Sequence, residues 1–148
     1  MSSMVTPARA AECDEIARSV TAWAAGRHDI TGIAAVGSWA RAEPRVDSDL
    51  DLVILTVDRQ RYVADASWVL RALSQQAEIV RTQDWGPLTE RRVVLQSGFE
   101  IEFGFAAPSW ASPDPVDAGT ARVVRDGCLP LHDPSRAFER LITAVRAT

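Results

Sequence analysis

The sequence lacks any apolar run long enough to cross a bilayer, which takes about 18 to 20 consecutive residues. The segment from Met1 to Arg9 also lacks the long apolar stretch of a signal peptide. We therefore expect no membrane span and a cytoplasmic protein. The two cysteines, Cys13 and Cys128, form no CxxC or zinc-binding spacing, so we expect reduced thiols with structural roles.

The chain also lacks the surplus of positive charge that is typical of general nucleic-acid binding proteins. Its formal net charge is −4 at pH 7, whereas neutralising a phosphate backbone needs a basic surface. The charge indicates no strong nucleic-acid interaction, but it does not exclude a nucleotide held through a metal ion. With 148 residues, 47% of them hydrophobic, the chain is long enough for one core, and we expect one domain over 1–148.

Apolar periodicity predicts an α+β domain with a mixed β-sheet packed on helices. The expected elements are, in chain order, a helix from Pro7 to a stop at Gly26, strands Ile30–Val36 and Leu50–Val57, a helix over Arg59–Gln76, a short strand Ala77–Val80, a hairpin of strands Arg91–Leu95 and Phe99–Phe105, a short helix ending near Arg125, and a last helix over 134–146.

Two carboxylates stand at the entrance of the expected strand Leu50–Val57. Because side chains alternate along a strand, Asp49 and Asp51 point to one side, opposite the apolar Leu52. Neighbouring anions repel each other, and burying unpaired carboxylates is costly. We therefore expect a bound divalent cation, Mg²⁺ by preference, because it takes carboxylate oxygens and usually also holds substrate phosphates.

A later segment carries a second acidic face. The residues Phe99 to Phe105 alternate between apolar side chains and a face of Glu100, Glu102 and Gly104. One face should therefore pack on helices while the other carries carboxylates. If this strand neighbours the Asp49/Asp51 strand, three or four acids converge, as needed for two Mg²⁺ ions that clamp an in-line displacement at phosphorus.

The turn before the acidic strand has the residues of a phosphate-binding loop. Gly37 follows an apolar strand, and glycine lets the backbone approach a phosphate closely. If a short helix begins at Ser38, its free N–H groups form an anion site, and the Ser38 hydroxyl donates to the same phosphate. Arg41 would add a forked guanidinium donor. Loop and acids together predict a site for a metal-bound nucleoside triphosphate.

The segments Gly37–Arg41 and Ser48–Leu52 resemble the nucleotidyltransferases of the DNA polymerase β superfamily. They are most similar to its small prokaryotic branch, which has the pattern G-S-x-A-R-G, a short spacer and S-D-x-D-L; Ala42 stands where a glycine is usual. The resemblance implies a polymerase β-like nucleotidyltransferase fold with a motif core over about 30–106. The stretch 127–134 is also similar to the tail of such domains.

The resemblance further implies Asp49 and Asp51 as catalytic metal ligands, with a third carboxylate on a later strand. Glu102 fits that place, and Glu100 remains a rival. The implied nucleotide-binding residues are Gly37, Ser38, Arg41 and Ser48. The implied reaction moves an NMP group from an NTP to a hydroxyl acceptor, a small molecule such as an antibiotic or a protein, and releases pyrophosphate.

Two other functions stay open. Few residues follow Glu102, too few for the helical domain with which many antibiotic-modifying members bind the acceptor. Short stand-alone members include antitoxins that act on a helical toxin partner, and an inactive relative would bind nucleotide without turnover. In the enzyme, Trp85 and Trp110 are candidates to line an acceptor cleft, which a second subunit of a homodimer would complete.

Overall fold

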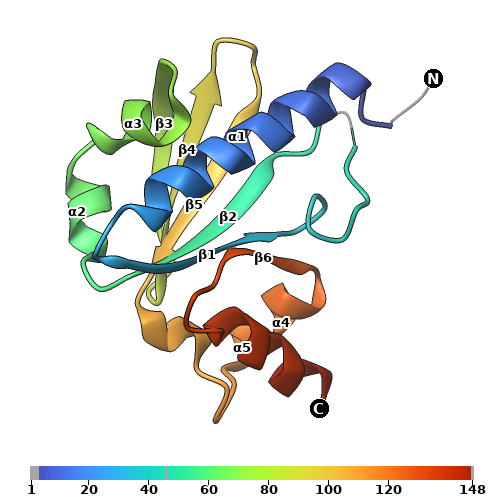
Figure 1. Ribbon diagram of the computed structural model, residues 1–148, viewed down its shortest axis with the longest axis vertical. Helices are drawn as coiled ribbons and strands as arrows, with labels where there is room; N and C mark the ends of the chain where they lie inside the picture. The colour runs from blue at the N-terminus through green and yellow to red at the C-terminus, as the bar shows by residue number, and fades with distance from the viewer. Residues whose placement is uncertain (1–3, 46, 148) are drawn as a thin grey trace.

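A six-stranded mixed sheet forms the centre of the molecule in the computed structural model, which describes residues 4–45 and 47–147 (Figure 1). The strand order is β3-β4-β5-β2-β1-β6. Strands β2 and β5 run parallel, and the other neighbouring pairs run antiparallel. The strands are β1 Ile30–Val36, β2 Leu50–Thr56, β3 Ala77–Asp84, β4 Leu88–Leu95, β5 Glu100–Ala106 and β6 Cys128–His132.

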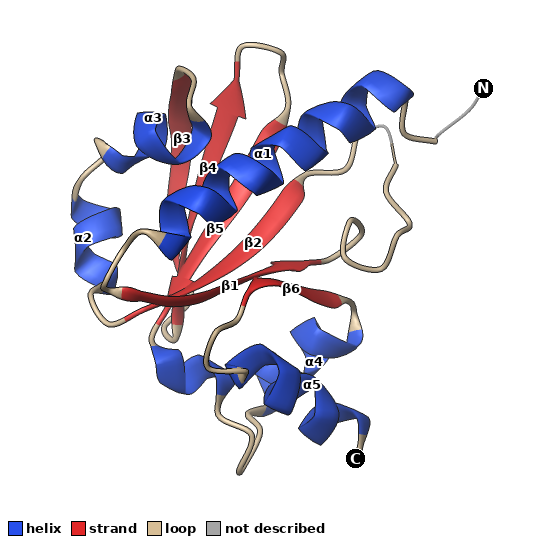
Figure 2. Cartoon of the chain, viewed as in Figure 1, coloured by secondary structure: helices blue, strands red, loops and turns tan. Residues whose placement is uncertain are grey.

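Helices cover both faces of this sheet (Figure 2). Three of them lie on one face, and two lie with a 3₁₀ turn on the other. On the first face are α1 Pro7–Ala25, α2 Arg59–Ala64 and α3 Trp68–Leu73, and on the second are η1 Pro108–Ala111, α4 Ala118–Arg125 and α5 Ala137–Arg146. No helix in the described ranges is long and apolar enough to span a membrane.

The central strands supply both cores because their side chains alternate. Leu52 and Ile54 of β2 pack under α1 and α3, whereas Val53 and Leu55 pack under α4 and α5. A strand that is buried on both faces has a continuous apolar sequence, as β2 has from Leu52 to Leu55. Strand β2 therefore carries its acid, Asp51, at its beginning, on the face of α4 and α5.

The first helix has the ends that the sequence predicts. Thr6 is the N-cap, and its hydroxyl oxygen accepts a hydrogen bond of 3.1 Å from the Arg9 amide. Pro7 follows at the first position, where its missing N–H costs nothing. Gly26 is the C-cap, and its amide donates back to the last turn.

The prediction of one helix over Arg59–Gln76 is wrong, because this segment forms two short helices, α2 and α3, with a break between them. Asp65 adopts an extended conformation, and its carboxylate accepts bonds from the Ser67 amide and hydroxyl. The Trp68 indole N–H donates to the carbonyls of Tyr62 and Asp65, at 3.0 and 2.9 Å. Helix-period patterns cannot show such a break, because the apolar spacing continues across it.

Other element boundaries also differ from expectation. Strand β3 reaches Asp84 instead of Val80, because its second half pairs with an extended β4. Strand β6 was not expected, and it pairs with β1 at the sheet edge. The last helix begins at Ala137 rather than 134, although the Asp133 carboxylate still caps it by accepting bonds from the amides of Phe138 and Glu139, at 3.1 and 3.0 Å.

Candidate active site

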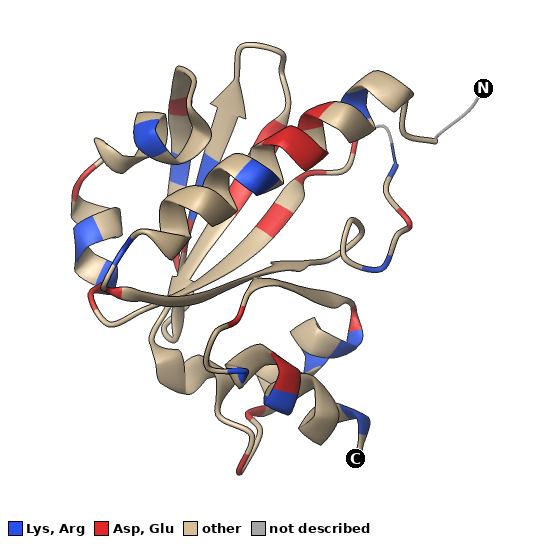
Figure 3. Ribbon diagram, viewed as in Figure 1, with Lys and Arg blue, Asp and Glu red and all other residues tan. Residues whose placement is uncertain are grey.

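Three carboxylates meet on the sheet face opposite α1. Strands β2 and β5 are parallel neighbours, and their register places Asp51 opposite Glu102. Asp49 lies one residue before β2 on the same side. One carboxylate oxygen from each of Asp49, Asp51 and Glu102 lies within 4.8 Å of the others. The structure therefore brings together the three residues that the sequence suggests as metal ligands. Figure 3 shows acidic positions in red on the neighbouring strands of this part of the sheet.

Gly37 lies directly against this triad. Its φ is +79°, and a Cβ at this position would lie 2.7 Å from Oδ2 of Asp51. A side chain would therefore be strained by the backbone conformation and would also collide with the carboxylate. The chain then turns, and the Arg41 amide donates to the Gly37 carbonyl at 3.2 Å. The residues 37–42 form turns, not the short helix considered from the sequence.

The other expected nucleotide-binding residues take different places around this turn. The half-buried Ser38 has no hydroxyl partner among the described residues, so its hydroxyl remains available. The Ser48 hydroxyl accepts a bond of 2.7 Å from the Arg45 amide and closes the turn before β2. Arg41 binds away from the triad, because its Nη1 donates to the Asp126 carbonyl at 2.9 Å.

Two arginines that the sequence analysis did not assign to the site contact the triad. Arg92 on β4 donates from Nη1 to Oδ2 of Asp49 at 2.8 Å and from Nη2 to Oε1 of Glu102. Arg81 on β3 lies 3.3 Å from Oε1 of Glu102. Pairing of β4 with β5 sets Arg92 directly opposite Glu102. The sequence could have predicted this neighbour, because the turn of the expected hairpin fixes which residues of its two strands lie opposite each other.

Arg81 reaches the same face through a β-bulge. Ile79 packs in the core under α1 and α3, and strict alternation would send residue 81 to that core as well. The register of β3 on β4 shifts between Ile79 and Arg81, which turns Arg81 toward Glu90 and Glu102. A bulge of this kind re-aims a side chain, and no feature of the alternation predicts it.

The carboxylates around the triad outnumber the two arginines that contact them. Two of these carboxyl groups have a raised pKa. Burial raises the pKa of the Asp51 carboxyl to about 8, with the charge and hydrogen bond of Glu102 and the charge of Asp49 adding to the effect. The pKa of Glu90 on β4 is also raised, by burial and then by Glu102. Like charges in one site favour the protonated form of one member. The cluster is therefore electrostatically strained.

The donor set fits a hard divalent cation. All three candidate ligands are carboxylates, they come from adjacent parallel strands, and none is fully exposed. Mg²⁺ is bound by one or two carboxylates together with substrate phosphates. A dication at Asp49, Asp51 and Glu102 would also relieve the repulsion that raises the pKa of Asp51.

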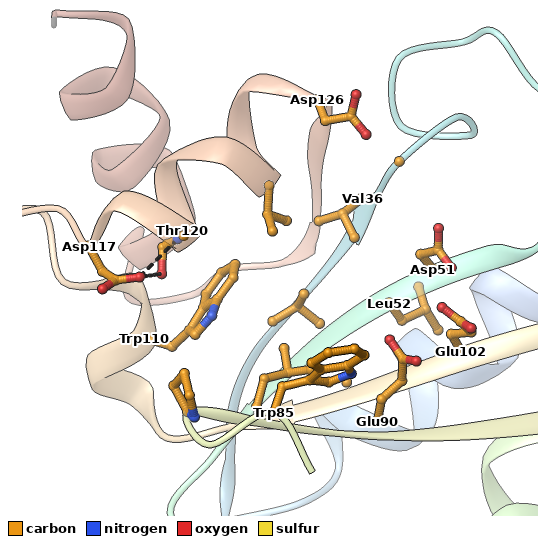
Figure 4. A pocket seen from close by; sticks show the side chains of 17 residues that line it. Val36, Asp51, Leu52, Trp85, Glu90, Glu102, Trp110, Asp117, Thr120 and Asp126 are labelled. Atoms are coloured by element: carbon orange, nitrogen blue, oxygen red, sulfur yellow. Dashed lines mark hydrogen bonds between the residues drawn. The ribbon is translucent and has the colours of Figure 1, made fainter. Parts of the chain in front are cut away.

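A cleft of about 410 Å³ leads away from the triad between the sheet and α4. Asp51, Glu90 and Glu102 lie at one end, and the indoles of Trp85 and Trp110 point into it farther along (Figure 4). Both tryptophans thus line a cleft beside the acids, as the sequence analysis considered. Trp68, by contrast, is a core residue with 4% of its surface exposed.

The two cysteines stand outside this chemistry. Neither forms a disulfide. Burial, followed by the nearby acids, raises the pKa of the Cys13 thiol to about 12. Burial and then Asp133 raise that of Cys128 to about 11. Thiols of this kind are poor nucleophiles at neutral pH.

Comparison with solved structures identifies the fold, whereas comparison with sequences does not. No family model and no curated protein sequence matches the chain significantly. Solved structures do match: the Cid1 poly(U) polymerase has a TM-score of 0.51 at 13% identity, and Cid1 in complex with the UTP analog UMPNPP has 0.51 at 14%. Each alignment covers 69% of this chain and 32% of that chain, so the likeness spans a minor part of those proteins. The expected polymerase β-like nucleotidyltransferase fold is thereby confirmed.

Proposed function

We propose that the protein is a metal-dependent nucleotidyltransferase that moves an NMP group from an NTP to a hydroxyl acceptor and releases pyrophosphate. The observation that carries this proposal is the convergence of Asp49, Asp51 and Glu102 within 4.8 Å beside the Gly37 turn. The nucleotidyltransferase fold supports the same reaction class. We assign the activity to one domain over residues 1–148, with its motif core near 30–106.

The proposed roles follow from the positions of the residues. Asp49, Asp51 and Glu102 would hold Mg²⁺, which when bound neutralises phosphate charge and lowers the pKa of an acceptor hydroxyl. Gly37 lets the backbone pack directly against the Asp51 carboxylate, so the turn that follows lies beside the proposed metal site. The free Ser38 hydroxyl is placed to donate to a substrate phosphate. Arg41 and Ser48 would support the loop rather than touch the nucleotide, since their partners lie within the protein.

The proposed reaction is an in-line displacement. The acceptor oxygen forms a bond to the α-phosphorus while the bond from this phosphorus to the β-phosphate oxygen breaks, so that pyrophosphate leaves. The hydroxyl proton would pass to a carboxylate of the cluster and then to water; Glu102 is the candidate on β5, because it lies in the cluster with Asp49 and Asp51. Positioning and charge stabilisation would supply most of the rate enhancement.

Transfer of label from α-³²P-labelled NTPs tests the proposal directly. With Mg²⁺ and a panel of hydroxyl acceptors, we expect pyrophosphate release and a labelled acceptor. Asp49→Asn and Asp51→Asn should each lower the rate by about a hundredfold or more, because each removes a metal ligand. Asp47→Asn is the matched control, since this exposed acid lies in the same segment outside the triad. Equal rates in Asp51→Asn and Asp47→Asn would contradict the assignment.

The third carboxylate has its own test. Glu102 is the less exposed acid of β5, with 16% of its side chain accessible against 39% for Glu100. Only Glu102 belongs to the cluster with Asp49 and Asp51. We expect Glu102→Gln to lower the transfer rate by about a hundredfold and Glu100→Gln by less than about fivefold. The reverse order would move the third ligand to Glu100.

A further inference from the structure

Arg92 lies inside the carboxylate cluster as a positively charged bridge. Its Nη1 donates to Oδ2 of Asp49 at 2.8 Å, and its Nη2 donates to Oε1 of Glu102. The pairing of β4 with β5 sets Arg92 directly opposite Glu102, and only 21% of its side chain is exposed. A guanidinium stays protonated in proteins and presents its donors in a fixed planar fork. The bridge therefore keeps a positive charge between two of the candidate metal ligands.

The bridge takes carboxylate oxygens that a second metal ion would need. Two ions about 4 Å apart must share ligands when a site offers three carboxylates. Arg92 holds one oxygen of Asp49 and one of Glu102, and Arg81 contacts that same Glu102 oxygen at 3.3 Å. The other oxygen of each, Oδ1 of Asp49 and Oε2 of Glu102, accepts no bond from an arginine that the structure describes. Together with Asp51, these oxygens suffice for one Mg²⁺.

Asp51 lies on the other side of the cluster from this bridge. No arginine in the described ranges forms an ion pair with it. It contacts the Gly37 turn, where a Cβ would lie 2.7 Å from its Oδ2. Figure 4 shows the carboxylates of Asp51 and Glu102 beside each other at the end of the cleft. The cluster thus has its own cation on the β4 side and a carboxylate without a counter-charge on the side of the turn.

A second ion could replace the bridge only if the guanidinium left the cluster. Arg92 also lies 3.4 Å from Glu100, so its departure would break three ion pairs at once. The side chain is half-buried, and breaking a buried ion pair leaves an uncompensated charge. The contacts therefore favour a guanidinium that stays in place when the first ion binds.

We propose that Arg92 replaces a second metal ion, so that this active site binds its nucleotide with one divalent cation. The inference rests on the proposed function, and it departs from the two Mg²⁺ ions considered in the sequence analysis. Arg92 is a positioning residue, which sets the spacing of Asp49 and Glu102 and supplies positive charge that a second ion would otherwise bring. The one cation is held by Asp51 and by the remaining oxygens of Asp49 and Glu102.

Electron paramagnetic resonance of bound Mn²⁺ counts the ions without any turnover. The samples contain saturating Mn²⁺ and NTP analogues with a methylene bridge between the α- and β-phosphates, which cannot be transferred. Two Mn²⁺ ions about 4 Å apart couple magnetically, whereas one bound ion gives an uncoupled spectrum. We expect only the uncoupled spectrum from the natural protein. A coupled spectrum from the natural protein would overturn the inference, whatever the variants do.

Arg92→Met is the decisive variant, because methionine keeps an apolar stem and removes the charge. We expect the coupled spectrum to appear in this variant, since the two bridged oxygens become available to a second ion. Arg81→Met is the matched control, because Arg81 contacts Glu102 but not Asp49, and it should keep the uncoupled spectrum. Far-UV circular dichroism checks that both variants fold. An uncoupled spectrum from folded Arg92→Met, or a coupled one from Arg81→Met, would also overturn the inference.

This readout separates the inference from the proposed reaction. If no analogue binds with Mn²⁺, the nucleotidyltransferase proposal fails. Mn²⁺ titration of the nucleotide-free protein then still tests Arg92, because the coupled spectrum should appear at saturation in Arg92→Met and not in the natural protein. If the analogues bind and the natural protein gives the coupled spectrum, only the role of Arg92 is overturned.

Discussion

At the residue scale, the triad carries electrostatic strain that a bound metal ion would relieve. Asp51 is half-buried beside Glu102 and Asp49, and burial followed by these acids raises its pKa to about 8. The usual value for an aspartate is about 3.9. Residues of a metal site commonly carry such strain, because the ion that relieves it is also the functional ligand.

Asp51→Asn should therefore stabilise the metal-free protein. The folded pKa lies above the unfolded one, so between about pH 4 and pH 8 the folded state holds a proton that the unfolded state releases. The contribution of Asp51 to stability thus falls as pH rises through this window. We expect Asp51→Asn to raise the free energy of unfolding at pH 8 by about 1–3 kcal/mol, and by less at pH 5.

Urea unfolding in EDTA at the two pH values measures this difference. Asp47→Asn serves as the control and should change stability by less than about 0.5 kcal/mol at both. A variant that is less stable than the natural protein at pH 8 would show that Asp51 is not under electrostatic strain.

Arg92 occupies the cluster as an internal cation. Its guanidinium lies 2.8 Å from Asp49, contacts Glu102, and lies 3.4 Å from Glu100. A metal ion that binds the same oxygens must compete with these ion pairs. We expect Arg92→Met to raise the affinity for Mn²⁺ in the absence of nucleotide by about five- to tenfold, because it removes the competing charge.

Electron paramagnetic resonance of free Mn²⁺ gives this affinity. Arg18→Met, which changes an exposed arginine on α1, should leave it unaltered. Weaker Mn²⁺ binding by Arg92→Met would mean that the guanidinium organises the carboxylates rather than competing for them.

At the element scale, the break between α2 and α3 shows how local polar contacts override periodicity. The Trp68 indole N–H and Nη1 of Arg91 both donate to the carbonyls of Tyr62 and Asp65. These bonds satisfy backbone groups that a continuous helix would pair internally. They also hold the Trp68 ring against Phe103 and Phe105, at centroid distances of 4.9 and 5.2 Å.

Trp68→Phe should destabilise the protein by about 1–3 kcal/mol, because it deletes a buried N–H that serves two carbonyls and also shrinks the ring. Urea unfolding followed by far-UV circular dichroism measures this loss. Trp85→Phe is the control for the same chemical change at an exposed ring, and should cost less than about 0.5 kcal/mol. Equal losses in the two variants would contradict the role given to the Trp68 indole.

Sequence patterns located most elements but not their interruptions. The Thr6–Pro7 cap, the strand Ile30–Val36 and the hairpin turn before Phe99 all follow local rules, and the structure confirms them. The break at Asp65 depends on a distant partner, Arg91, and β6 forms only because β1 offers a free edge. Such tertiary pairings leave no periodic signal in one segment.

The residues of the candidate site also fall into two groups, those that local sequence patterns predict and those that depend on tertiary structure. Asp49, Asp51 and an acid of β5 were predictable, because alternation and the assumption that the two strands are neighbours bring them together. Alternation alone could not separate Glu102 from Glu100, and the family resemblance favoured Glu102.

The contact of Arg92 with Glu102 could also have been predicted, because the hairpin turn sets the register that pairs these two residues. The contact of Arg81 could not, because a β-bulge turns it to the site face. The cleft depends on how α4 packs over the sheet, which no single segment encodes.

At the scale of the whole molecule, the sheet separates two tasks. One face packs a continuous aromatic and aliphatic core under α1 and α3. The other face carries the acids at the start of β2 and β5, and leaves a cleft under α4. The packed core thus fixes the carboxylates, while the other face leaves them open to the cleft.

The central claim is that this acidic face binds a nucleotide through a metal ion. Calorimetric titration of each of the four NTPs tests it most directly, with Mg²⁺ and then with EDTA, for the natural protein and for Asp49→Ala/Asp51→Ala. The account predicts binding that requires both Mg²⁺ and the two aspartates, with Asp47→Ala behaving like the natural protein. Binding that survives EDTA and the double substitution, or no binding of any NTP with Mg²⁺, would contradict it.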